Sequence, residues 1–202
     1  MIYRSIFTLV IIFLLNSCVK NNFDMKLKEY NLPLQFDGNF ELVQFSEEPI
    51  ILLGENSENG NVIKVRIIPI NANMDLPNII KNQLAKTISN YQYSSAPYPG
   101  QLSQIVNCGT KKRPILKYFG NFSYMQLYGR DRLGLSICDS DHFTHMSYTS
   151  YFLDEKSNRV IVVDLRETIR EKNGQLLNLL SHKFSVFKPI SLKPYENLFQ
   201  FH

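Results

Sequence analysis

Residues 144–167 read THMSYTSYFLDEKSNRVIVVDLRE, and they carry the strongest sign of strand structure in the chain. Two runs rich in β-branched and aromatic residues, Thr144–Leu153 and Arg159–Glu167, flank the polar segment Asp154–Asn158. Apolar runs of this length on either side of a short polar segment are typical of antiparallel strands joined by a turn.

Two more strand-like runs precede this pair, Asn121–Tyr128 and Leu133–Cys138. The segment Gly129–Arg132 between them is typical of a turn, and Asp139–Asp141 forms a polar break before the next run. Closely spaced runs joined by such short segments predict an antiparallel meander.

A hairpin is predicted earlier in the chain. The runs Pro49–Gly54 and Val62–Ile68 are apolar and β-branched, and the segment Glu55–Gly60 between them is dense in turn formers and ends in Asn-Gly. A further strand before the hairpin is indicated by three apolar residues: Phe40, Leu42 and Phe45.

Two amphipathic helices are predicted. Asp75 is placed to cap the first, over residues 76–90, with Pro77 in its first turn. The second follows Gly174 and runs to Phe187, with Pro189 preventing its continuation. The apolar residues at helical spacing are Leu76, Ile79, Ile80, Leu84 and Ile88 in the first, and Leu176, Leu177, Leu180, Phe184 and Phe187 in the second. The sequence therefore predicts an α+β fold, an antiparallel sheet covered by two helices.

This order of elements resembles that of the Mog1/PsbP-like domains. The resemblance rests on the hairpin at 50–68, the helix at 76–90, and the run from Tyr151 through Val163 into the helix ending at Phe187. It implies a layered α+β architecture. That family carries no common catalytic residues, so the resemblance implies none in this chain.

Length and composition favour one globular domain. The chain has 202 residues, of which 44% are hydrophobic and 20% charged, so it can bury a core of ordinary size. The formal net charge of +4 is small and dispersed, which gives no support for nucleic-acid binding.

Residues 1–17 form a predicted signal peptide. Arg4 precedes an apolar run from Ile6 to Leu15, which is too short to span a membrane as a helix. The run ends in Leu15-Asn16-Ser17-Cys18, which resembles the lipobox of bacterial lipoproteins. The resemblance implies that Cys18 receives a diacylglycerol, that the chain is cut before it, and that the new amine is acylated, with palmitate as a typical chain. The membrane is then the first partner of the protein.

The same resemblance suggests a location. Val19 follows the cysteine, whereas lipoproteins retained in the inner membrane often carry Asp there, so we expect an outer-membrane lipoprotein facing the periplasm. Residues 18–30 are expected to form the lipidated cysteine and a flexible tether spanning about 20 Å. Residues 31–202 are expected to form a single α+β periplasmic domain.

Two cysteines remain once Cys18 is assigned to the lipid, namely Cys108 and Cys138. In an oxidising compartment they are expected to form a disulfide, and closing a loop of about 30 residues would contribute roughly 3 kcal/mol. Two free thiols are the main alternative, and a redox or metal role is a lesser one because no CxxC spacing occurs.

The stretch from Gln92 to Pro114 shows no regular pattern, and loops of this length are uncommon unless they bind something or move. It is therefore the predicted contact surface for a protein partner. The candidate partner-binding residues are Tyr93, Tyr98, Lys111, Lys112 and Arg113. A packed surface loop with an ordinary solvated basic run is the alternative.

Potential metal ligands gather in one short segment, Asp139–His145 with Cys138 before it. A metal-dependent or hydrolytic envelope enzyme would use this segment, but His142 and His145 would face opposite sides of a straight strand, and Cys138 could not bind metal while in a disulfide. A solvated polar turn explains the segment better. We therefore expect no enzyme activity, no metal and no cofactor.

The sequence thus favours a membrane-anchored envelope lipoprotein with a non-catalytic binding or adaptor domain. One specific version is an immunity protein against a secreted toxin, which predicts a neighbouring toxin gene and tight one-to-one binding. A small-ligand carrier with a groove between sheet and helices is a further alternative.

Overall fold

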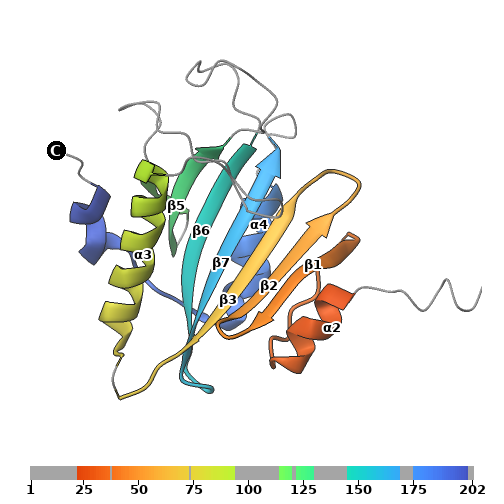
Figure 1. Cartoon of the computed structure of the whole chain (residues 1–202), viewed down its shortest axis with the longest axis horizontal. Helices are drawn as coiled ribbons and strands as arrows, with labels where there is room; N and C mark the ends of the chain where they lie inside the picture. Colours follow the sequence, from red (N-terminus) through yellow and green to blue (C-terminus); the bar gives the residue numbers. More distant parts are fainter. Residues whose placement is uncertain are drawn as a thin grey trace, which may run out of the picture.

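The structure is a computed structural model of the whole chain, and it describes residues 22–36, 38–72, 74–93, 114–119, 122–129, 145–168 and 175–199. An antiparallel sheet forms the centre of the molecule, with helices against it (Figure 1). Within the described residues its strands lie in the order β1-β2-β3-β7-β6-β5-β4, and β8 pairs with β6.

The eight strands, in chain order, are β1 (Phe40–Glu47), β2 (Ile50–Asn56), β3 (Val62–Pro69), β4 (Ile115–Phe119), β5 (Phe122–Gly129), β6 (His145–Asp154), β7 (Arg159–Thr168) and β8 (Lys188–Pro189). The predicted hairpin, the strand before it and the β5, β6 and β7 strands are confirmed. The predicted run Leu133–Cys138 lies outside the described residues.

The predicted antiparallel pairing of β6 and β7 is confirmed. Leu153 lies opposite Val160 and Asp154 opposite Arg159, on either side of the turn. Alternate residues of β7 then enter two separate cores: Val160 and Val162 on one face of the sheet, Ile161 and Val163 on the other. The unbroken apolar run of β7 is therefore explained by a strand that is buried on both faces.

Helix α3 (Leu76–Tyr93) covers one face, which we call the α3 face. It begins as predicted, because the Asn78 backbone N–H donates a 2.9 Å hydrogen bond to the Asp75 carboxylate. Its buried residues Ile79, Ile80 and Leu84 pack on the sheet. The C-terminal helix η5 (Lys193–Phe199), a 3-10 helix, contacts α3 on this side.

Helix α4 (Gln175–Lys183) covers the opposite face, which we call the α4 face. The prediction that this helix continues to Phe187 is wrong. The chain tightens into the 3-10 helix η4 (Phe184–Val186), and Phe187 is extended, with φ −108° and ψ 158°. This change of direction buries Phe184 and carries the chain into β8, which pairs with the end of β6.

The predicted flexible tether over residues 18–30 is wrong for residues 22–29. Residues Asn22–Glu29 form helix α2, and its Phe23 and Leu27 are fully buried in the core of the α4 face. Phe23 packs directly on Gly54 of β2, where an added Cβ would lie 2.8 Å from the ring. The apolar contacts that order this helix are made with distant strands, so the local sequence gives little sign of them.

The α+β class, with an antiparallel sheet and covering helices, is confirmed. Strand β4 was not anticipated, because it is only five residues long and no clear alternation marks it. In the part of the chain that the structure describes, no helix is both long enough and apolar enough to cross a membrane.

Candidate functional site

Most of the residues predicted to function lie outside the described part of the chain. These are Cys18, Cys108, Cys138, Tyr98, Lys111, Lys112 and Arg113. Tyr93 is the last residue of α3, and its side chain is not among those described. Of the segment Asp139–His145, only His145 is placed, as the first residue of β6. The described residues therefore leave these predictions as they stand.

A different surface is well defined, and it lies at the sheet edge formed by β4. We call Ile115, Lys117, Tyr118 and Phe119 the β4 edge. Three of these are large apolar side chains that remain accessible, with Ile115 38%, Tyr118 53% and Phe119 37% exposed. Because β4 is the last strand of the sheet among the described residues, the edge combines apolar side chains with backbone groups of the kind that pair with an added strand.

The two sides of β4 face different surroundings. Ile115, Lys117 and Phe119 lie on the same side as the α4 face, because they pair with Gln126, Tyr124 and Phe122 of β5. Tyr118 alternates to the α3 face. A partner that adds a strand here would therefore meet an apolar side chain on each face of the sheet.

A ladder of aromatic rings supports Phe119 from behind. The ring of Phe119 lies 5.8 Å from Phe122, Phe122 lies 6.2 Å from Tyr124, and Tyr124 lies 5.7 Å from the buried Tyr148, measured between ring centroids. Tilted and edge-on pairs at these separations are favourable. The exposed ring is thus the end of a packed row and is held in a defined position.

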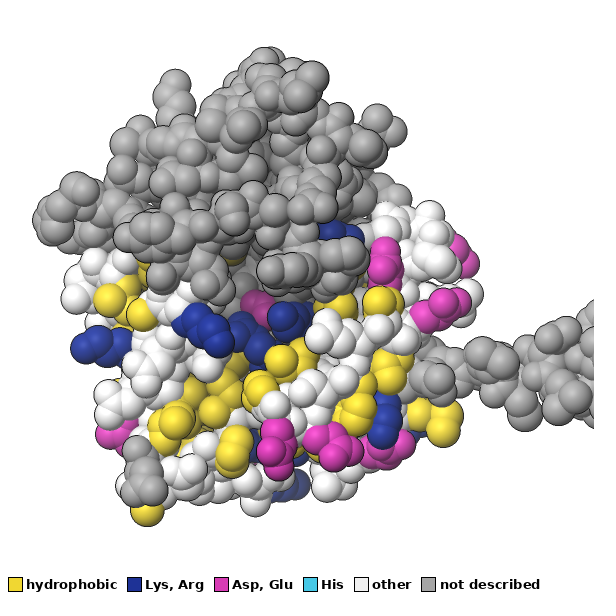
Figure 2. Space-filling view, in the orientation of Figure 1, with side chains coloured by type: hydrophobic (Ala, Val, Ile, Leu, Met, Phe, Trp, Pro, Cys, Tyr) yellow, Lys and Arg dark blue, Asp and Glu magenta, His cyan; other side chains and the backbone are white. Residues whose placement is uncertain are grey.

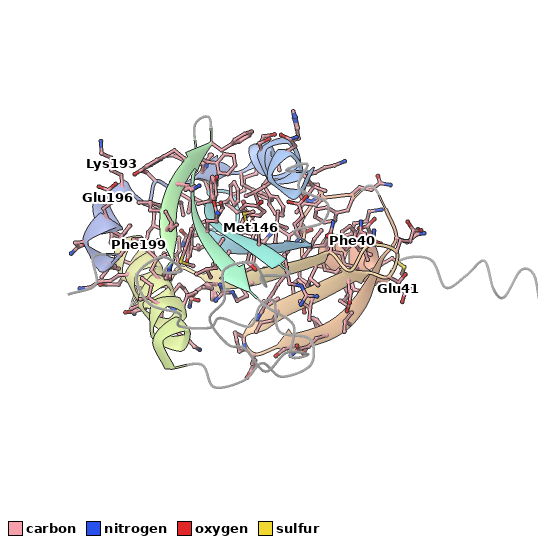
Figure 3. The ribbon with its side chains drawn as sticks, turned by 90° about the horizontal axis from the view of Figure 1, so that it is seen from above. Phe40, Glu41, Met146, Lys193, Glu196 and Phe199 are labelled. Atoms are coloured by element: carbon pink, nitrogen blue, oxygen red, sulfur yellow. The ribbon has the colours of Figure 1, made fainter. Side chains whose placement is uncertain are left out.

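The C-terminal segment supports Tyr118 on the other face. The Tyr118 hydroxyl donates a 3.2 Å hydrogen bond to the Glu196 carboxylate of η5. The segment is itself fixed to the sheet, because the Leu192 N–H donates a 2.7 Å hydrogen bond to the Ser123 hydroxyl and Leu192 is fully buried. Glu196 projects from η5 at this end of the molecule (Figure 3).

A second group of polar residues lies in the middle of the α3 face. Arg66 of β3 contacts the Asp164 carboxylate of β7 at 3.1 Å and donates a 2.6 Å hydrogen bond to Gln83 of α3. The Thr149 hydroxyl of β6 donates a 2.6 Å hydrogen bond to Asp164. This polar network connects three strands and a helix, and Figure 2 shows Lys and Arg side chains grouped on this face above an apolar area.

The polar network carries more positive than negative charge. Lys64 lies directly across from Asp164 in the β3–β7 register, next to Arg66, so two cations share one carboxylate. Burial lowers the pKa of Lys64, although the nearby Asp164 charge acts in the opposite direction. The side chains of the network bond chiefly to one another, which suits a structural role better than one in chemistry.

The described residues contain no group of three or more His, Cys, Asp or Glu side chains that could hold a metal ion. The carboxylates that are buried there have protein partners, as with Asp164 and with Asp154, whose side chain lies 2.8 Å from Arg159.

The sequence could have indicated a strand over Ile115–Phe119, although not its place at the sheet edge. The run Ile-Leu-Lys-Tyr-Phe follows Pro114 directly and is rich in aromatic and branched residues, but its brevity and its place after an irregular stretch hide it. A scan against protein-family models found no family that matches this chain, and a search of curated proteins found no significant relative.

Proposed function

We propose that this chain is a lipid-anchored protein of the bacterial envelope whose folded domain, similar in architecture to Mog1/PsbP-like domains, binds a protein partner and catalyses nothing. The anchor is a lipid on Cys18, and the domain faces the periplasm, with the outer membrane as the favoured location. The partner binds at the β4 edge. An immunity protein that intercepts a toxin at the membrane is one specific form of this proposal.

The exposed apolar side chains of the β4 edge are the observation that carries the binding role. An isolated exposed Leu or Phe is ordinary on a protein surface, but here three large apolar side chains belong to one terminal strand of five residues. Tyrosine is among the residues that contribute most to protein interfaces, and an edge strand supplies backbone hydrogen bonds as well. Together these features favour a partner that pairs along β4.

The basic run that precedes β4 favours the same region. Lys111, Lys112 and Arg113, predicted as contact residues, end only two positions before Ile115. Basic side chains next to an apolar edge would favour a partner with acidic residues beside its pairing strand. Lys117 within β4 adds a positive charge to the same edge.

Site-specific photo-crosslinking in the native host tests the binding role. A photo-reactive amino acid in place of Tyr118 should give one discrete protein adduct, whereas the same group in place of the exposed Lys156, in the turn between β6 and β7, should not. Adding Phe119→Ala and Ile115→Ala should weaken the adduct at position 118 by about tenfold. Equal adducts at positions 118 and 156 would refute binding at this edge.

The intact mass of the protein isolated from membranes tests the anchor. We expect a chain that begins at an acylated Cys18, and a full-length unlipidated chain for Cys18→Ala. A further deficit of two hydrogens would show that Cys108 and Cys138 form the predicted disulfide. An unlipidated wild-type chain would refute the anchor and the compartment assigned from it.

A metal-dependent enzyme centred on Asp139–His145 is the rival function, and its test is separate. Stoichiometric zinc in the purified protein, together with loss of function in His142→Ala and His145→Ala, would support the enzyme and contradict the proposal. A small-ligand carrier would instead copurify a ligand and give no adduct at position 118.

A further inference from the structure

The attachment of α2 to the core leaves almost no free chain between the proposed lipid and the folded domain. Helix α2 begins at Asn22, four positions after Cys18. Four residue steps of fully extended chain cover at most about 14 Å, whatever conformation they adopt. The length of the connection therefore limits how far the folded domain can move from the bilayer.

The contacts of α2 show that the helix is part of the folded body. Phe23 and Leu27 are fully buried, and the Phe23 ring packs within 5.8 Å of Phe36 and 6.3 Å of Phe40, between ring centroids. Releasing the helix would expose two large apolar side chains and leave a cavity against Gly54. The helix cannot act as a tether without a large loss of stability.

We infer that the end of the domain formed by α2 and β1 lies against the membrane, and that the β4 edge therefore points away from it; this inference rests on the proposed lipidation of Cys18. Figure 1 shows that α2, which begins at Asn22, lies beside β1 at one side of the sheet. Phe40 and Glu41 of β1 lie at that end, while Lys193, Glu196 and Phe199 of η5 lie at the opposite end (Figure 3).

The strand order gives the separation between the two ends. β1 and β4 are the first and last of seven strands in the main path of the sheet. At about 4.8 Å between neighbouring strands, the β4 edge lies roughly 29 Å from β1 along the sheet. This distance is about twice the reach of the connection to Cys18, so a domain held by its α2 end with the sheet upright keeps the β4 edge clear of the bilayer.

The side chains at the membrane-facing end indicate that the lipid, and not the protein surface, keeps the domain at the membrane. Met25 of α2 and Val43 of β1 are 58% and 50% exposed, but Glu41 and Glu47 are exposed on the same strand. Anionic headgroups would repel these carboxylates and attract the exposed Lys28 of α2, so charge adds little net attraction. The end is therefore expected to rest at the headgroup level because the acyl chains hold it there.

Fluorescence quenching on vesicles tests this orientation. Protein isolated from membranes of a bacterial host would be reconstituted into vesicles of phosphatidylethanolamine and phosphatidylglycerol containing a lipid with a nitroxide headgroup. A fluorescent amino acid would replace either Met25 or Glu196, both of which are exposed. We expect the probe at position 25 to be quenched several-fold more strongly than the probe at position 196.

Two control variants separate the possible failures. Cys18→Ala should not bind the vesicles, and a wild-type chain that also fails to bind would refute the proposed lipidation itself. A flexible Gly-Ser insertion between Asn21 and Asn22 should remove most of the difference between the two probes. Equal quenching at positions 25 and 196 in bound protein, or a difference that the insertion leaves unchanged, would overturn the inference.

Discussion

At the scale of single residues, Gly54 is the clearest case, because the lack of a side chain there lets Phe23 of α2 pack directly on the sheet. An added Cβ would lie 2.8 to 2.9 Å from three atoms of the Phe23 ring, and that ring is fully buried and cannot swing away. We expect Gly54→Ala to lower the free energy of unfolding by about 1–3 kcal/mol. Urea unfolding followed by circular dichroism measures this, since the chain has no tryptophan.

A second background separates the clash with Phe23 from any general effect of placing alanine in a strand. In a Phe23→Leu background the smaller side chain leaves room, so Gly54→Ala should cost clearly less than in the wild type. Equal costs in the two backgrounds would show that the Phe23 contact is not what requires glycine at this position.

The ion pair between Asp154 and Arg159 gives a prediction of pH dependence. Burial by itself would raise the pKa of Asp154, but the hydrogen bonds from Arg159 and Ser157 outweigh it and lower the pKa below its ordinary value. A carboxyl group with a lowered pKa in the folded state contributes stability above its unfolded pKa of about 3.9, and loses it as the pH falls through the folded pKa.

Asp154→Asn should therefore cost about 1–3 kcal/mol of unfolding free energy at pH 7, where the charged hydrogen bond that Arg159 donates at 2.8 Å is intact. The difference between wild type and variant should shrink as the pH falls below 4. A difference that stays constant from pH 7 to pH 3 would contradict the role of the charge, and Glu155→Gln in the adjacent exposed turn is the matched control.

At the scale of elements, α2 departs most from what the sequence suggests. We expect Leu27→Ala to lower the free energy of unfolding by about 2–5 kcal/mol, because the side chain is fully buried. Met25→Ala, on the exposed side of the same helix, should change it by less than about 0.5 kcal/mol. Equal small effects of the two changes, measured by urea unfolding, would show that α2 is not part of the core and that the predicted flexible tether was correct.

The elements predicted correctly share a physical property. Both the β6–β7 hairpin and α3 are encoded by their local sequence. The hairpin is marked by a polar turn between two apolar runs, and α3 by the Asp75 cap before an apolar stripe. By contrast, α2 depends on Phe36, Phe40 and Gly54, which are distant in sequence, and a short helix has too little propensity of its own to reveal it.

The candidate site could be predicted less well than the fold, for a related reason. An edge strand is defined by the absence of a neighbour, and strand order is a property of the whole sheet. Nothing in the five residues of β4 indicates that this strand lies at the edge of the sheet. The polar network was equally hidden, because Arg66, Gln83 and Asp164 are brought together only by the pairing of β3 with β7 under α3.

At the scale of the whole molecule, the two cores share the central strands of the sheet, and β7 contributes to both. β7 contributes Val160 and Val162 to the α3 face and Ile161, Val163 and Leu165 to the α4 face, and all five side chains are fully buried. The two faces should therefore unfold together, because neither core survives without β7. The edges differ from this centre: β1 contains a bulge between Leu42 and Gln44, and β4 is short and exposed.

Native-state hydrogen exchange should show that amides at the centre of the sheet are better protected than amides at its edges. Amides of β7 that bond to β3 or β6 are expected to exchange only by global unfolding, with opening free energies equal to the free energy of unfolding. Amides of β4 should open more easily, because β4 has a single neighbour among the described strands. That mobility would suit an edge that must accept a partner strand. Protection in β4 equal to that in β7, in the free protein, would show that the edge is already covered, and would count against the binding role proposed for it.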